Sequence, residues 1–228
     1  MSLERTELLF GAEAMERLKA ALVVVVGIGG VGGHAAESLA RSGVGRLILI
    51  DGDEVESSNL NRQIFASKDF IGMAKTEAAK QRLNQVSDAE ITGLKAVLTA
   101  KNVSNLIPKN ANFVIDAIDD LNGKVSIIEY CKRNDIPFIS CLGAGNRTDP
   151  TAFTVTDIEK TEYCPLARKL RKELRRLDIR GVSVVFSKEK PSLNEARRVG
   201  SFAPVTGTCG LVAAAWACKK IINSEVRT

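Results

Sequence analysis

Apolar runs of strand length alternate with amphipathic segments of helix length along most of this chain. Residues 22–26 (LVVVV) form an apolar, β-branched run without alternation, which predicts a strand buried on both faces. The other predicted strands are residues 46–50, 90–94, 113–118, 137–141, 152–156 and 183–186. Helical spacing predicts helices at residues 3–20, 34–41, 74–86, 103–107, 124–133 and 165–181. The apolar face of the first helix is predicted to consist of Leu8, Ala12, Met15 and Leu18.

The order of these elements predicts the fold class. Strand and helix alternate from residue 22 to residue 142, which indicates a parallel sheet with right-handed crossovers. We therefore expect an α/β fold: a doubly wound, mainly parallel Rossmann-like sheet with helices on both faces and a C-terminal extension. The 228 residues are expected to form a single domain, with an N-terminal helix in 1–20, a nucleotide-binding core in 21–142 and a C-terminal part in 143–228.

The composition is that of a globular protein from a reducing compartment. Hydrophobic residues make up 45% of the chain and charged residues 26%, which suits a sizeable core and a hydrated surface. The 5 cysteines include no C-x-x-C pair, so neither a disulfide framework nor a structural zinc site is indicated. Residues 199–218 lack charge over a membrane-spanning length, but their proline, glycines and hydroxyl groups favour a buried C-terminal helix. We expect a cytoplasmic protein without a membrane span.

A glycine-rich turn follows the first predicted strand. Gly27, Gly29 and Gly32 give the spacing GxGxxG, and Gly30 is an additional glycine. Glycine lets the chain turn sharply and bring bare backbone N–H groups against a phosphate, and the dipole of the following helix favours the same anion. Asp51, at the end of the next strand, can reach a ribose hydroxyl. The strand, the helix and this acid together predict nucleotide binding.

The glycines and Asp51 by themselves first suggest an NAD-dependent oxidoreductase, but the rest of the predicted site argues against it. The loop after the second predicted strand supplies Asn59 and Arg62, and the following helix opens with Lys75. The next buried strand ends in Asp119. Two cations, an amide and a carboxylate around a phosphate loop suit a triphosphate with Mg²⁺ better than a nicotinamide.

Four stretches of this sequence carry a family resemblance: GIGGVG from Gly27, LIDGDEVESSNLNRQ ending at Gln63, GMAKTEAAKQRL from Gly72 and VIDAIDD from Val114. They resemble the ubiquitin-activating-enzyme-like superfamily. Its bacterial members adenylate carboxylates, including those of the thiamine and molybdopterin sulfur-carrier proteins. The resemblance implies an α/β adenylating enzyme that uses ATP and Mg²⁺.

The resemblance also implies roles for individual residues. It implies that Asp51 binds the ribose and that Asp119 binds Mg-ATP. The phosphates would be bound by Asn59, Arg62 and Lys75. Arg5, in the segment ERTELLFG, resembles the family arginine that reaches into the neighbouring subunit's site, which implies a homodimer.

The later half of the chain narrows the resemblance. The stretches PFISCLGAGNRTDPTAFTVTDIEKTEYCPLARKLRKELRR and VSVVFSKEKP resemble the tRNA threonylcarbamoyladenosine dehydratases. Those enzymes use ATP to activate the carboxylate of a threonylcarbamoyl group beside the tRNA anticodon, and the group then closes on itself with loss of water. Two alternatives stay open: adenylation of a ubiquitin-like sulfur-carrier protein, whose enzymes generally have the zinc-binding C-x-x-C pairs missing here, and NAD-dependent oxidation. A sulfur-transfer protein is a further partner to consider.

The net charge of the chain is concentrated in one predicted helix. Residues 165–181 hold seven basic and two acidic residues, whereas basic and acidic residues balance in the rest of the chain. Leucines are predicted to form the buried stripe of this helix, and the basic stripe consists of Arg168, Arg171, Lys172 and Arg175. We predict that this stripe, extended by Arg197 and Arg198, contacts tRNA phosphates. The alternative is the solvated face of an ordinary amphipathic helix.

The sequence disfavours both a catalytic thiol and a catalytic imidazole. His34, the only histidine, lies in the first turn of the phosphate helix, where a structural role is favoured over proton transfer. The cysteines predicted to lie in the core are Cys131, Cys141 and Cys218. Cys164 is predicted to cap the basic helix, and Cys209 to lie in a flexible GTCG segment. Neither thiol is needed for a cyclisation whose nucleophile belongs to the substrate.

Overall fold

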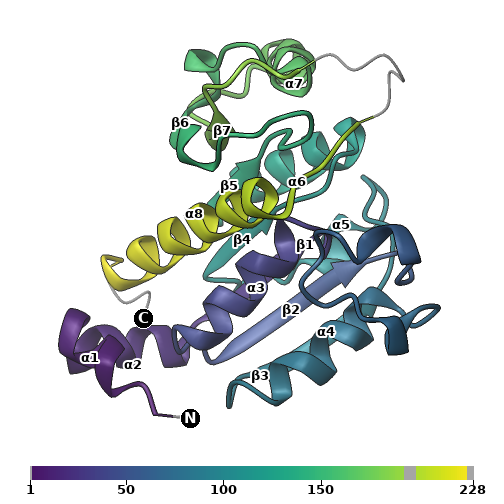
Figure 1. Cartoon of the computed structure of the whole chain (residues 1–228). Coiled ribbons are helices and arrows are strands. Elements are labelled where there is room, and N and C mark those ends of the chain that lie inside the picture. The colour runs from purple at the N-terminus through teal and green to yellow at the C-terminus, as the bar shows by residue number, and fades with distance from the viewer. Residues whose placement is uncertain (1, 193–198, 225–228) are drawn as a thin grey trace.

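A seven-stranded sheet runs through the computed structural model, which describes residues 2–192 and 199–224 (Figure 1). The strands are β1 (Leu22–Val26), β2 (Arg46–Asp51), β3 (Glu90–Lys95), β4 (Phe113–Asp116), β5 (Phe138–Cys141), β6 (Phe153–Asp157) and β7 (Ser183–Ser187). Their order is β3-β2-β1-β4-β5-β7-β6. Neighbouring strands are parallel except β6, which pairs antiparallel with β7 at the edge. The predicted Rossmann-like α/β fold is confirmed.

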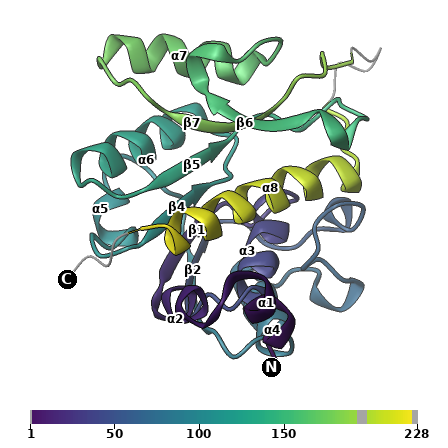
Figure 2. The same ribbon diagram turned by 90° about the vertical axis from the view of Figure 1, so that its left-hand side faces the viewer.

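Helices cover both faces of this sheet (Figure 2). They are α1 (Glu4–Phe10), α2 (Ala12–Ala20), α3 (Gly32–Arg41), α4 (Lys75–Asn84), α5 (Val103–Leu106), α6 (Leu121–Arg133), α7 (Pro165–Arg176) and α8 (Ala203–Ile222). Short 3-10 turns are η1 (Ser57–Asn59), η2 (Lys68–Phe70), η3 (Pro150–Ala152) and η4 (Ile158–Lys160). Val23 and Val25 of β1 pack with α2, α3, α4 and α8, whereas Val24 and Val26 pack with α5 and α6. The unbroken apolar run of β1 is therefore explained by burial on both faces.

The N-terminal segment differs from its prediction. Instead of one helix, α1 and α2 are separated at Gly11, whose φ of 84° requires the left-handed region that glycine adopts readily. None of the residues of α1 is buried, and Leu8 is 82% exposed, so Leu8 does not share the buried face of Met15 and Leu18. This α1–α2 unit lies near the amino ends of β1 and β2, since Gly45, just before β2, donates its N–H to Leu18 O at 3.1 Å.

The apolar C-terminal segment forms α8, which lies across the face that also carries α3 (Figure 2). By length and composition it is the one helix among the described residues that could cross a membrane, and 56% of its apolar window is buried inside the molecule. Gly210 lets α8 approach α3 closely, because a Cβ there would lie 2.2 Å from Val31 O. The contacts of α8 are those of a core helix, as predicted. Arg197 and Arg198 lie outside the described residues.

Candidate functional site

The candidate site lies where the strand order reverses. β2 and β4 flank β1 on opposite sides, so the loops after β1 and β4 lead to helices on opposite faces of the sheet. Open α/β sheets generally bind their ligands in the crevice at the carboxyl edge of such a switch point. Hydrogen bonds join the main chains of these loops to the ends of the neighbouring strands. Gly27 N donates to Ile50 O and Ala117 N donates to Val26 O, both at 2.8 Å. The loops that follow β1, β2 and β4 therefore meet at one point.

Three of the four glycines in residues 27–32 are closed in by their neighbours, and the fourth is open. Gly27 has a φ of 87°, and a Cβ there would lie 2.9 Å from the carbonyl of Ala117 in the β4 loop. A Cβ on Gly32, where α3 begins, would lie 1.8 Å from Gly27 O. Gly30 is closed in by Thr206 of α8 and by Arg62, whereas a Cβ on Gly29 would meet nothing nearer than 3.9 Å. Gly29 is thus the position that is open to a ligand.

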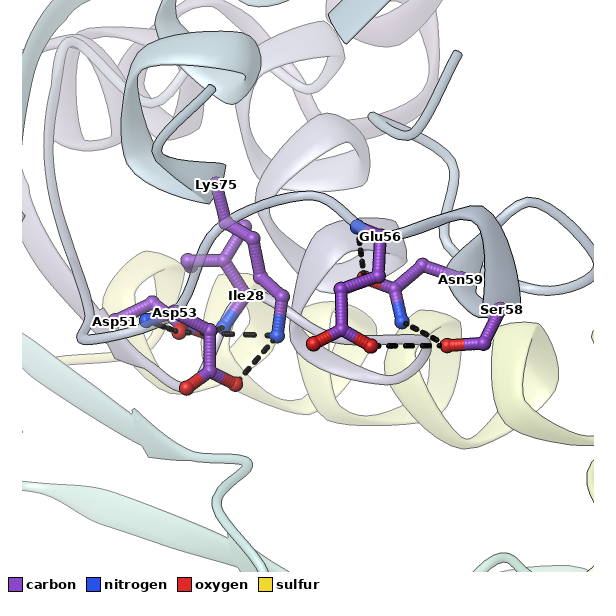
Figure 3. A network of polar contacts seen from close by, with 7 residues as sticks. All are labelled: Ile28, Asp51, Asp53, Glu56, Ser58, Asn59 and Lys75. Carbon is purple, nitrogen blue, oxygen red and sulfur yellow. Dashed lines mark hydrogen bonds and ion pairs between the residues drawn. The ribbon is translucent and has the colours of Figure 1, made fainter. Parts of the chain in front are cut away.

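Asp51 and Lys75 form a polar cluster against the glycine loop, residues 27–32 (Figure 3). Ile28 N donates to Asp51 Oδ2 at 2.6 Å, and Asp53 N donates to Oδ1 at 2.9 Å. Lys75 is 7% exposed; its Nζ lies 2.7 Å from Asp53 Oδ2 and 3.9 Å from Asp51 Oδ1. Because each carboxylate oxygen has a second lone pair, Asp51 retains acceptor capacity for a hydroxyl group.

Arg62 and Asn59 come from the β2 loop but lie differently. Arg62 Nη1 donates to Ser58 O at 2.8 Å and to Asn61 Oδ1 at 2.9 Å, and its Cγ would lie 3.3 Å from a Cβ on Gly30. The stem of Arg62 thus packs beside the glycine loop, and its guanidinium has no carboxylate partner in these contacts. Asn59 is buried, and its Oδ1 accepts from Glu56 N at 3.0 Å (Figure 3). In this structure Asn59 orders the loop that carries Arg62.

Asp119 lies in the loop between β4 and α6, which contacts Gly27 through Ala117. Its side chain is exposed. The base of the same loop is fixed by a buried ion pair: Lys124 Nζ lies 3.0 Å from both carboxylate oxygens of Asp116 and donates to Cys141 O at 2.7 Å. Asp120 begins α6 by accepting from Gly123 N at 2.6 Å. The arrangement presents Asp119 on a rigid base at the edge of the crevice.

Other predicted site residues lie elsewhere. Arg5 is exposed on α1, near the amino ends of the strands, so it does not join the cluster of its own chain (Figure 1). On α7 the predicted exposed stripe is only partly correct. Arg168 and Lys172 are exposed, but Arg171 is half-buried and donates to Thr161 O at 2.7 Å and to Ile158 O at 3.2 Å. Arg175 pairs with Glu159, and this contact lowers the pKa of the Glu159 carboxyl.

All five cysteines are buried free thiols. Cys164 caps α7 as predicted, since Ala167 N donates to its Sγ at 3.4 Å. Cys209 does not lie in a flexible segment: it is inside α8 and 0% exposed. A hydrogen bond with Cys141, followed by burial, raises the pKa of Cys209 well above its ordinary value. A thiol held protonated in this way is a poor nucleophile. His34 Nδ1 lies 2.8 Å from Gly30 O and so has the structural role expected of it.

Three residues at the site were not predicted from the sequence. Asp53 pairs with Lys75, Gln63 faces Gly29, and Thr206 closes in Gly30. Asp53 and Gln63 could have been predicted, because they belong to the motif LIDGDEVESSNLNRQ, which also contains Asp51, Asn59 and Arg62. No sequence signal indicated Thr206, because only the packing of α8 on α3 brings it to the glycine loop.

Comparison with known proteins identifies the family. Residues 3–228 match the sequence model of the ThiF family. The chain belongs to the ThiF family. The superfamily resemblance drawn from the sequence is thereby confirmed, and the NAD-dependent oxidoreductase alternative is not supported.

Relatives within the ThiF family are similar over most of the chain. The tRNA threonylcarbamoyladenosine dehydratase of Bacillus subtilis (strain 168) is 42% identical over 189 residues, which cover 82% of this chain and 74% of the relative. The enzyme of that name from Escherichia coli (strain K12) is 38% identical, covering 97% of this chain and 94% of its own. The crystal structure of the E. coli enzyme in complex with ATP superposes with a TM-score of 0.91 at 40% identity, over 96% of this chain and 93% of that one.

Proposed function

We propose that this ThiF-family protein catalyses the ATP-dependent dehydration of threonylcarbamoyladenosine in tRNA. The observation that carries the proposal is the joint placement of Asp51, Arg62 and Lys75 against the glycine loop, in which Gly29 is open. This arrangement belongs to a chain whose relatives in B. subtilis and E. coli are named for this activity, and the E. coli enzyme has been solved in complex with ATP. The glycine loop and the start of α3 would accept the phosphates, with Asp51 toward the ribose.

The first step is adenylation. The substrate carboxylate attacks the α-phosphorus of ATP, an acyl–oxygen–phosphorus linkage forms, and pyrophosphate leaves. A carboxylate is already a nucleophile, so this step needs no general base. It needs positioning, and positive charge where the transition state and pyrophosphate are negative. Arg62 and Lys75 would supply that charge, which accounts for two cations beside an anion-binding loop.

The second step closes the ring. The carbamoyl group of the same substrate attacks the activated acyl carbon, and AMP leaves with one oxygen of the former carboxylate. The net change in the substrate is the loss of one water. Because nucleophile and electrophile belong to one molecule, this step also depends mainly on geometry and exclusion of bulk water. No thiol is required, in agreement with the burial of Cys209 and Cys164.

The residues present fit a Mg²⁺ ion bound together with ATP. Within the described part of the chain, no group of three or more His, Cys, Asp or Glu side chains is arranged to hold a metal. Mg²⁺ characteristically uses one or two carboxylates plus substrate phosphates and water. The exposed carboxylate of Asp119 would be such a ligand, and the bound ion would neutralise charge on the triphosphate.

A homodimer is part of the proposal. α1 exposes Leu8 (82%), Leu9 (73%) and Phe10 (42%) on consecutive positions, which is unusual for a helix that faces only water. Arg5 lies on the same helix, away from its own crevice. We infer that α1 packs against a second copy of the chain and that Arg5 completes the partner's phosphate site. A cytoplasmic location and a sulfur-transfer partner remain predictions.

We expect tRNA to contact α7 through Arg168 and Lys172, whose side chains are exposed and have no hydrogen bond or ion pair among the described contacts. Each cation that neutralises a phosphate releases counterions, so the double variant Arg168→Ala/Lys172→Ala should weaken tRNA binding and flatten its salt dependence. The matched control is Arg171→Ala/Arg175→Ala, which removes two cations already engaged with Thr161 and Glu159. Binding is measured at several salt concentrations. If the parent and Arg168→Ala/Lys172→Ala have equal tRNA affinities and equal salt dependence, the basic side of α7 is a solvated surface that does not bind tRNA.

The experiment that tests the proposed function compares substrates. The protein is incubated with ATP and Mg²⁺ and either tRNA bearing threonylcarbamoyladenosine, the same tRNA without it, or a ubiquitin-like sulfur-carrier protein. AMP release should require the modified tRNA. Pyrophosphate release with the carrier protein alone would instead support the sulfur-carrier alternative, because adenylation of the carrier leaves AMP bonded to it. Release of neither AMP nor pyrophosphate with any of the three would reject both.

A further inference from the structure

Arg147 is a buried cation that has no acidic partner among the residues that the structure describes. Its side chain is 4% exposed, and it follows β5 in the loop of residues 142–149. Nε donates to Glu189 O at 3.2 Å, and Nη1 donates to Gly143 O and to Gly145 O, the latter at 3.1 Å. All of these acceptors are main-chain carbonyls. Nη2 is buried and has no hydrogen-bond acceptor among the described residues.

The two other buried cations in residues 2–192 and 199–224 are paired. Lys124 lies 3.0 Å from Asp116, and Lys75 lies 2.7 Å from Asp53. The nearby acid Glu189 does not form an ion pair with Arg147, because its carboxylate accepts hydrogen bonds from Thr148 N and Asp149 N at 3.0 Å. A guanidinium cannot relieve burial by losing its proton, and an unpaired buried charge is costly. A bound anion would offset that cost.

The loop of Arg147 belongs to the same edge of the sheet as the crevice. β5 and β7 are parallel to β4, so their carboxyl ends lie beside the loop that carries Asp119. Asn146 exchanges hydrogen bonds with Gly200, N to O at 2.8 Å and Gly200 N to Oδ1 at 2.6 Å. The next residue, Ser201, accepts from Asn61 Nδ2 at 3.3 Å, and Asn61 also holds Arg62. A continuous chain of contacts thus joins Arg147 to the phosphate side of the site.

The spacing of the strands separates Arg147 from the expected nucleotide position. The glycine loop follows β1, whereas Arg147 follows β5, two strands away, or about 10 Å at the usual interstrand distance. Anionic groups of ATP would be served by the glycine loop, Arg62 and Lys75. Arg147 therefore lies at the same sheet edge as the expected nucleotide position but to one side of it, where the other substrate would be bound.

We propose that Arg147 binds an oxyanion of the second substrate, either a carboxylate or a phosphate. This identification of the ligand as a second substrate rests on the function proposed above. Nη2 carries two N–H donors, and a hydrogen bond from a guanidinium to an oxyanion is stronger than one between neutral groups. Since Nη2 is enclosed in this structure, binding requires a local shift of the surrounding loop, a movement that ligands often produce.

The test uses probes that separate the two oxyanions. The nucleoside threonylcarbamoyladenosine carries a carboxylate and no phosphate, and unmodified tRNA carries phosphates and no such carboxylate. Binding of each is measured for the parent, Arg147→Gln, Arg147→Lys and the exposed control Arg180→Gln, whose contact is with Asp178. Arg147→Gln should weaken one probe by about ten- to a hundredfold, as expected for a charged hydrogen bond. The control should match the parent, and ATP should bind all four proteins equally.

The outcomes assign or reject the site. Weakened nucleoside binding assigns the carboxylate, and weakened tRNA binding with intact nucleoside binding assigns a phosphate. Unchanged binding of both probes to Arg147→Gln overturns the inference. If Arg147→Gln does not fold, Arg147→Lys serves in its place, because it keeps the charge but not the fork; parent-like affinity for both probes would then overturn the inference.

A third probe, inorganic phosphate, makes the anion site testable apart from the substrate. It should raise the thermal unfolding temperature of the parent more than chloride at equal ionic strength, and less in the Arg147 variants. If phosphate stabilises the parent more than the variants but neither substrate probe binds, the proposed function is rejected and the anion site is supported. Equal stabilisation of the parent and the variants would count against the anion site.

Discussion

Replacing Arg62 with alanine is expected to lower the rate of AMP formation by about a hundredfold or more, which corresponds to about 2.7 kcal/mol of transition-state stabilisation. Lys75→Ala and Asp119→Ala should have effects of the same size. The reason is the same for all three: in the proposed reaction charge develops on the departing pyrophosphate, and these groups would stabilise it directly or through Mg²⁺. ATP binding should weaken less than turnover falls, because the contacts strengthen as the charge develops.

Two controls separate loss of chemistry from loss of fold. Arg133→Ala removes an exposed cation that pairs with Glu129 at the far end of α6, and its turnover should equal that of the parent. Thermal unfolding should show Arg62→Ala and Asp119→Ala close to the parent, since neither side chain is buried. Lys75→Ala leaves Asp51 and Asp53 without their cation and should unfold somewhat earlier. Turnover within a few-fold of the parent in all three folded variants would contradict the adenylation assignment.

Mixing two inactive proteins, Arg5→Ala and Arg62→Ala, is expected to restore activity. If Arg5 acts in the partner's site, a heterodimer of the two variants contains one crevice with both arginines and one with neither. The intact crevice should give up to about half of the parent's activity per heterodimer. The structure motivates the test because α1 holds Arg5 at the opposite end of the strands from its own crevice (Figure 1).

The mixing experiment needs proof that subunits exchange. Differently tagged copies are co-purified to show that heterodimers exist, and each variant mixed with its own kind serves as the control. Recovery only in the mixed sample would place Arg5 in trans. Verified exchange without recovery would place Arg5 in its own subunit's site or outside the site, and a monomeric parent would remove the homodimer from the proposal.

The nucleotide-binding half was predictable because its signals are local. An apolar β-branched run such as Leu22–Val26 has few structural alternatives when glycines and an amphipathic helix follow it. The positions of Asp51, Arg62 and Lys75 around the glycine loop followed from sequence motifs, and the ends of parallel strands bring such loops together. Boundaries shifted by only a few residues, as for β4, which ends at Asp116 rather than at residue 118.

The errors arose where a distant segment decides the local structure. A helix tolerates an internal glycine, so only the backbone at Gly11 shows that α1 and α2 are separate. Arg171 shares a helical stripe with Arg168, but the turn around Thr161 folds back and takes its guanidinium. The glycines beside Cys209 suggested flexibility, whereas Gly210 is glycine because α8 lies against α3. Arg147 gave no signal, because pairing and burial are properties of the folded chain.

Mass analysis of the modified nucleoside tests the proposed function most directly. tRNA carrying threonylcarbamoyladenosine is incubated with the protein, ATP and Mg²⁺, then digested to nucleosides under conditions that preserve a cyclic product. The nucleoside should lose the mass of one water, in proportion to the AMP released, and Arg62→Ala should leave it unchanged on the same timescale. An unaltered nucleoside mass in the presence of active, ATP-binding parent protein would contradict the proposed dehydration.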